Sequence, residues 1–213
     1  MVMSTGREGQ SSEQILASEA EWKALVEEGN ESFAKERYSV AEIKFKDALE
    51  LAEKLLELQT VNPEVEGQSL PQEASSDSST KKLDAQIRLT KSLNNLAALY
   101  HVQGKYGMAE ELYEKCLDLK LNIYGEEHLE VAVNLHNLAV LHSAKRTFLK
   151  AELLYKRALE IREKLLGADH QDLIPVLRNY GLLLTKNKRK EEGVVFQERA
   201  AAIEAAHKAD KAV

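Results

Sequence analysis

The chain has 213 residues, with 35 acidic and 29 basic side chains and a formal net charge of −6. Alanine, leucine, glutamate and lysine dominate, and only 3 prolines and 10 glycines are present, a composition that favours helices. No run approaches the roughly 18 apolar residues that a membrane-spanning helix needs, and the N-terminus lacks the pattern of a secretory signal. We therefore expect a cytoplasmic, all-α protein without membrane insertion. Its single cysteine, Cys116, excludes an internal disulfide.

The N-terminal third of the sequence predicts one helical repeat between two flexible segments. Residues 1–12 are expected to be disordered. The first repeat is predicted at about 20–59, where apolar residues recur at spacings of three and four. Residues 60–79 contain two of the three prolines and five serines, so they cannot bury enough apolar surface to offset the entropy lost on ordering. They are predicted to form a flexible insert, with the next helix starting near Thr80.

Three later segments repeat one pattern at an offset of 42 residues. Each contains two amphipathic stretches separated by a turn, such as the one around Gly104. We predict antiparallel helical hairpins at about 80–124, 129–166 and 171–207. Small residues recur in three columns that would let the paired helices approach closely: Ala97, Ala139 and Gly181; Ala109, Ala151 and Gly193; Cys116, Ala158 and Ala200.

The turns between hairpins also recur, as Gly125-Glu-Glu-His128 and Gly167-Ala-Asp-His170. A glycine there suits the left-handed conformation that ends many helices. The small columns resemble the tetratricopeptide repeat, and the 42-residue spacing with the Gly-x-x-His turn resembles the repeats of kinesin light chain. This resemblance implies a right-handed superhelical solenoid of about four helix-turn-helix repeats over residues 13–208, followed by a short tail at 209–213.

In such a solenoid the first helix of each repeat lines a concave groove. Asn95, Asn137 and Asn179 recur at one register of that helix, and a side-chain amide can donate to and accept from the backbone of an extended peptide. Alternatively, these asparagines bond to the neighbouring helix and set the repeat spacing. The full set of predicted groove residues is Asn30, Lys91, Asn94, Asn95, His101, His136, Asn137, Arg178, Asn179 and Lys186.

The charge distribution suggests the chemistry of the partner. Residues 1–80 carry a net charge of −10, whereas residues 81–213 carry +4. The basic lean of the later repeats favours a protein or peptide with acidic residues. It is too weak for nucleic-acid binding, and the cluster Lys186, Lys188, Arg189 and Lys190 fits a solvated turn better than a phosphate site, because no aromatic residue lies among them.

No motif for catalysis is present, neither a glycine-rich phosphate loop nor a nucleophile elbow. His136 and His142 are six residues apart, about 240° around a helix, so they cannot hold a metal together. We expect no enzyme activity, cofactor or metal. The sequence favours a non-catalytic adaptor that binds an extended peptide segment in its groove.

The alternative is a structural or self-assembling subunit that uses its terminal helix faces. No capping helix follows residues 191–206, which suggests a homo-oligomer formed through the last helix. The apolar stripe expected there comprises Val194, Val195, Phe196, Ala200 and Ile203.

Overall fold

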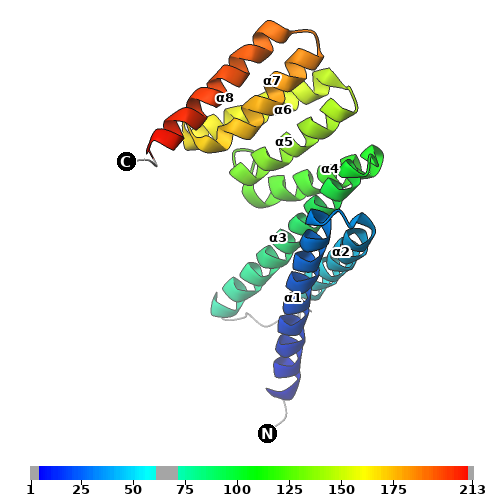
Figure 1. Ribbon diagram of the computed structural model, residues 1–213. Coiled ribbons are helices and arrows are strands. Elements are labelled where there is room, and N and C mark those ends of the chain that lie inside the picture. The colour runs from blue at the N-terminus through cyan, green and yellow to red at the C-terminus, as the bar shows by residue number, and fades with distance from the viewer. Residues whose placement is uncertain (1–4, 61–71, 211–213) are drawn as a thin grey trace. The chain divides into compact units, whose positions relative to one another are not determined.

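The computed structural model describes residues 5–60 and 72–210, and all its regular structure there is helical (Figure 1). The predicted all-α fold class is confirmed. The helices are α1 (Thr5–Ala34), α2 (Tyr38–Thr60), α3 (Gln72–Val102), α4 (Tyr106–Tyr124), α5 (Leu129–Ala144), α6 (Phe148–Leu166), the short 3-10 helix η1 (Gln171–Leu173), α7 (Ile174–Lys186) and α8 (Lys190–Asp210). They form two compact units, one ending at Lys105 and one beginning at Tyr106.

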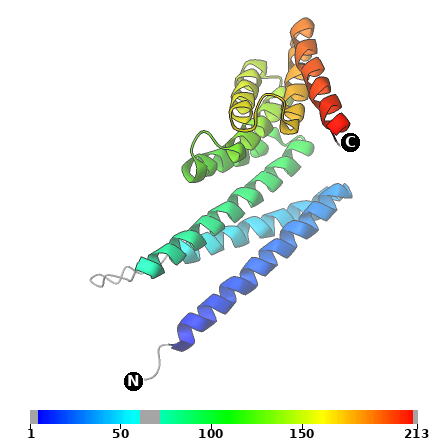
Figure 2. The same cartoon turned by 90° about the vertical axis from the view of Figure 1, so that its left-hand side faces the viewer.

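The first unit consists of α1, α2 and α3, with α2 packed on both of the others (Figure 2). Gly29 of α1 lies so close to α2 that a Cβ atom there would come within 2.6 Å of Cδ1 of Phe45. The chain's only tryptophan, Trp22, is buried and donates a hydrogen bond from Nε1 to Oγ of Ser92 on α3, at 2.8 Å. Burial of these aromatic rings therefore ties the three helices together.

The second unit contains α4 to α8, in which each helix packs on the next. Its core is built from aliphatic and tyrosine side chains of α5, α6 and α7, with Ala200 and Ile203 from α8. The small-residue columns are buried at every position, as their predicted packing role requires. Contact is closest where α7 meets α8, because a Cβ atom on Gly181 would lie 2.7 Å from the carbonyl oxygen of Gly193.

Each of the described turns places one residue at a positive φ angle. Gly125 and Gly167, which follow α4 and α6, have φ angles of 76° and 92°, as predicted for glycines that end helices. The turns inside the hairpins place one residue each in the same left-handed region, and only one of these residues is a glycine. These residues are Glu36, Gly104, Arg146 and Lys188.

Two helices begin earlier than the composition suggested. α1 starts at Thr5, within the segment expected to be disordered, and α3 starts at Gln72, eight residues before Thr80. No proline lies inside either helix, and Pro71 stands immediately before α3, where a proline does not interrupt helical hydrogen bonds. Residues 61–71, most of the predicted insert, lie outside the described residues.

The last helix is less exposed than expected. Ala200 and Ile203 are buried, and the ring of Phe196 packs against that of Tyr180 with centroids 4.4 Å apart. Of the predicted apolar stripe, only Val194 and Val195 are exposed. Phe196, Ala200 and Ile203 therefore form the inward face of α8, because α7 offers them an apolar surface to pack against.

Candidate functional site

The ten predicted groove residues divide between the two units. Asn30 lies on α1 and Lys91, Asn94, Asn95 and His101 lie on α3. Asn30 and Lys91 are exposed, whereas the three residues further along α3 are half-buried. Burial lowers the pKa of His101, so this imidazole is neutral near pH 7 and adds no positive charge to the predicted groove residues of α3.

The other five candidates lie on α5 and α7, which are in contact within the second unit. His136 Nε2 and Asn179 Nδ2 are 2.9 Å apart, and the imidazole also packs against the ring of Tyr155 at a centroid distance of 5.8 Å. Burial, together with the nearby Arg162, lowers the pKa of His136 to about 4. Asn179 is therefore engaged by a neutral histidine of the neighbouring first helix.

Asn137, Val140, Leu182 and Lys186 define what we call the first-helix face of the second unit. Asn137 and Val140 are three residues apart on α5, and Leu182 and Lys186 are four apart on α7, so each pair lies on one side of its helix. Asn137 and Val140 are half-buried, and the Leu182 side chain is 50% exposed. The face thus offers an amide, an apolar strip and a cation on adjacent helices.

The cations of the candidate set differ in their availability. Arg178 forms an ion pair with Glu204 of α8, at 2.5 Å. Lys91 and Lys186 are exposed, and no side chain in the described part of the protein forms an ion pair with either of them. Of the two candidate cations in the second unit, Lys186 is therefore the one available to an acidic partner.

A buried polar column near the asparagines was missed by the sequence analysis. Asn134 has no exposed surface, and its Nδ2 donates to the backbone carbonyl of Tyr113 on α4, at 2.8 Å. At the equivalent position of α3, the hydroxyl of Ser92 donates to the carbonyl of Ala48 on α2, at 3.4 Å. The bond from a first helix to the preceding second helix is thus made three residues before Asn137. The sequence did offer a signal for this contact: Ser92 and Asn134 are polar residues at a position of the repeat where the next copy has the apolar Val176.

A recurring glutamate was missed as well. Glu42, Glu110 and Glu152 each follow the small residue in the first turn of a second helix, and each forms an ion pair with a cation in the turn of the next hairpin. Hydrogen bonds from Lys46, and also from Lys105, lower the pKa of Glu42 to about 2. These carboxylates link successive hairpins. The repeated Ala-Glu dipeptide was the signal, and it is absent from the last repeat, where Gly193 is followed by valine.

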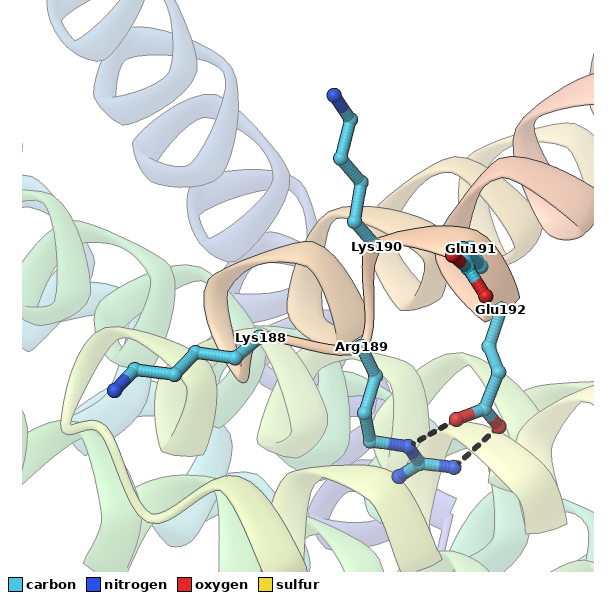
Figure 3. A pocket seen from close by; sticks show the side chains of 5 residues that line it. All are labelled: Lys188, Arg189, Lys190, Glu191 and Glu192. Atoms are coloured by element: carbon cyan, nitrogen blue, oxygen red, sulfur yellow. Dashed lines mark hydrogen bonds and ion pairs between the residues drawn. The ribbon is translucent and has the colours of Figure 1, made fainter.

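The basic turn between α7 and α8 lines a shallow hollow (Figure 3). Arg189 turns toward Glu192, to which it donates at 2.6 Å, and it also reaches Glu152 at 2.6 Å. Lys188 and Lys190 extend away from each other (Figure 3). Because the three cations do not converge on one point, this arrangement favours a solvated turn over a phosphate site.

The described residues show no arrangement for metal or thiol chemistry. Residues 15–59 and 79–209 hold no group of three histidine, cysteine or acidic side chains that could bind a metal ion. Cys116 is buried in the small-residue column, and burial raises the pKa of its thiol to about 11. It is therefore a packed side chain, as predicted. None of the described helices has the length and apolar character needed to span a membrane.

Known proteins share the fold. Residues 88–164 match the family model described as tetratricopeptide repeat. BtubC (BKLC) from P. vanneervenii is 20% identical, with a TM-score of 0.53 over 93% of this chain and 92% of that one. A kinesin light chain-like protein with nearly identical TPR-like repeats from Podosopora anserina is 16% identical, with a TM-score of 0.52 over 89% and 95%.

The apo form of RapI is also 16% identical, with a TM-score of 0.52 over 90% of this chain and 72% of that one. No curated protein sequence matches the chain. The matched segment covers the first two of the three repeats at a 42-residue offset, and the similar structures cover most of the chain. The predicted resemblance to tetratricopeptide repeat proteins is therefore confirmed: residues 88–164 match the family model, and the chain shares the helix-pair fold of these structures, kinesin light chain-like ones among them.

Proposed function

We propose that the protein is a non-catalytic adaptor of the cytoplasm that binds an extended segment of a partner protein on the first helices of its repeats. In the second unit this segment lies on the first-helix face. The Asn137 amide bonds to the peptide backbone, Leu182 contacts an apolar side chain, and Lys186 attracts an acidic one.

One observation carries the proposal. Leu182 is a large apolar side chain left half exposed beside an exposed lysine that has no ion-pair partner among the described residues. Folding alone does not require either feature at this place, whereas a peptide that is both apolar and acidic would bury the first and neutralise the second. Asn179 and Arg178 contribute less, because His136 and Glu204 already engage them.

The test begins with a library of random twelve-residue peptides displayed on phage. The tightest binding peptide is then synthesised and titrated against the protein and its variants by calorimetry. Asn137→Ala should raise Kd about fivefold or more, since a net hydrogen bond contributes on the order of 1 kcal/mol. Lys186→Glu should raise Kd further and weaken its dependence on salt, because exposed charge pairs are screened within about 10 Å at 0.1 M ionic strength.

Matched controls come from α4, which carries the exposed Asn122 and Lys115. Asn122→Ala and Lys115→Glu make the same chemical changes away from the first helices and should leave Kd unchanged. The proposal fails if the library yields no binder, or if the controls weaken binding as much as Asn137→Ala and Lys186→Glu. If Asn137→Ala lowers the melting temperature but leaves Kd unchanged, the asparagine is structural instead.

The alternative, self-assembly through the last helix, has narrower support. Val194 and Val195 are exposed on α8, at 40% and 62%, but Phe196 and Ile203 of that helix pack inward. A Val195→Glu variant would lose self-association if α8 were the contact. Light scattering of the two proteins over a range of concentrations measures this directly.

A further inference from the structure

The outer side of α6 carries two large apolar side chains that the fold leaves in solvent. Leu149 is 74% exposed and Leu153 is 61% exposed, and they lie one turn apart on the same side of the helix. Arg146 and Lys150 are exposed beside them, and no side chain of residues 79–209 forms an ion pair with either. We call these four residues the basic apolar face.

The outer side of α2 carries a similar surface of opposite charge. Ile43 is 58% exposed, and Val40, also exposed, lies one turn before it. The nearby carboxylates of Glu36 and Asp47 are exposed, and so is the guanidinium of Arg37. None of the three forms an ion pair with a side chain in the described part of the first unit, which leaves this surface one net negative charge. These five residues form the acidic apolar face.

The two faces occupy corresponding places in different repeats. Ile43 and Leu153 both stand two residues after the small residue in the first turn of a second helix, Ala41 in one case and Ala151 in the other. The repeat between them has a glutamate, Glu111, at this position. In the last repeat the position holds Val195, which is 62% exposed. Apolar exposure therefore recurs at this position, and the sign of the neighbouring charges is what distinguishes the faces of α2 and α6.

We propose that the acidic apolar face of one chain binds the basic apolar face of a second copy of the same chain. Docking would bury Ile43 and Val40 against Leu149 and Leu153, and it would bring carboxylates to cations. A contact between two α2 faces, or between two α6 faces, would instead oppose like charges, which disfavours a two-fold symmetric dimer. Charge complementarity within one sequence thus selects a head-to-tail contact between copies.

A head-to-tail contact has a distinctive consequence. Each copy that joins leaves one acidic and one basic apolar face free at the ends of the assembly, so growth continues until a ring closes or the protein is used up. The average mass in solution should therefore rise steadily with protein concentration. This goes beyond the proposed peptide site, which lies on the first helices and not on α2 or α6.

The experiment uses two variants that each block one face. Val40→Lys/Ile43→Lys makes the α2 face basic, and Leu149→Glu/Leu153→Glu makes the α6 face acidic. All four positions are exposed, so both variants should fold, which circular dichroism checks. Sedimentation velocity should show each variant alone at the mass of one chain. An equal mixture should assemble again, because the intact α6 face of the first variant can bind the intact α2 face of the second.

A control variant and a pair of charge-exchange variants test whether assembly depends on these two faces. Val195→Glu changes an exposed valine on α8 and should assemble like the unmodified chain. Arg146→Glu/Lys150→Glu should lose assembly, and mixing it with Glu36→Lys/Asp47→Lys should restore it, since the charges are exchanged across the contact. The proposal is overturned if the unmodified protein keeps the mass of one chain at every concentration, if the mixed variants do not pair, or if only Val195→Glu loses assembly.

Discussion

The contact between Gly181 and Gly193 allows a quantitative test of the small-residue columns. In Gly193→Ala, the new Cβ atom would lie 2.5 Å from the carbonyl oxygen of Gly181 and 2.7 Å from Oγ1 of Thr185, where ordinary contacts begin at 3.4 Å. The nearest atom belongs to the backbone of α7, so it cannot rotate away. The two helices would have to separate, which loosens the packing of Phe196 on Tyr180.

The magnitude follows from two opposing effects. Forcing extra volume into a well-packed contact costs about 1–3 kcal/mol. Replacing glycine by alanine inside a helix recovers at most about 1 kcal/mol. Gly193→Ala should therefore lower the free energy of unfolding by about 1–2 kcal/mol. The same substitution at Gly107, where nothing lies within 4 Å of the new Cβ atom, should instead raise it by a few tenths to about 1 kcal/mol.

Urea unfolding followed by far-ultraviolet circular dichroism measures both changes. The double variant Gly181→Ala/Gly193→Ala adds a further check, because both Cβ atoms push the same two helices apart. Once the helices have separated, the second substitution should cost less than it does alone. If Gly193→Ala is as stable as the unmodified chain, or if Gly107→Ala loses as much, the close approach of α7 and α8 does not limit this position.

Three other predictions follow from local geometry. The Nδ1 atom of His128 accepts from the backbone amide of Glu130 at 3.1 Å and caps α5, so His128→Ala should cost about 1 kcal/mol while His128→Asn, which can also cap, costs less in the same urea assay. Lys188 has a φ angle of 62°, so Lys188→Gly should raise the free energy of unfolding by up to about 1 kcal/mol and the melting temperature with it. An equal gain from Lys190→Gly in α8 would contradict this reasoning. His136 has a folded pKa of about 4 against an ordinary 6.5, so the unfolded chain takes up a proton that the folded chain excludes. The contribution of His136 to the free energy of unfolding is complete above pH 6.5 and is lost as the pH falls toward 4, a loss of about 2–3 kcal/mol. His136→Gln should reduce this loss when urea unfolding is repeated between pH 7 and pH 4.

The sequence could place most candidate residues on their helices, but it could not predict which hydrogen bonds and ion pairs these residues form. The 42-residue offset correctly brings His136 and Asn137 onto one first helix and Arg178, Asn179 and Lys186 onto the next. It could not reveal that Asn179 bonds to His136, or that Arg178 pairs with Glu204. Those partners are 43 and 26 residues away along the chain, and their meeting depends on how successive helices are rotated and spaced.

The features that each repeat needs in order to form can be recognised in the amino-acid sequence. Two amphipathic stretches, a small residue where they meet and a glycine after the second helix are short-range requirements, so they recur at a constant offset and can be recognised without coordinates. The tertiary structure alone decided which polar groups join one hairpin to the next. Glu152 is bound by Arg189 of the following turn, and Asn134 by a carbonyl of the preceding helix, only because stacking brings these distant segments within hydrogen-bonding distance. Packing columns follow from the repeating backbone geometry, whereas the polar contacts depend on side-chain positions that differ from one repeat to another.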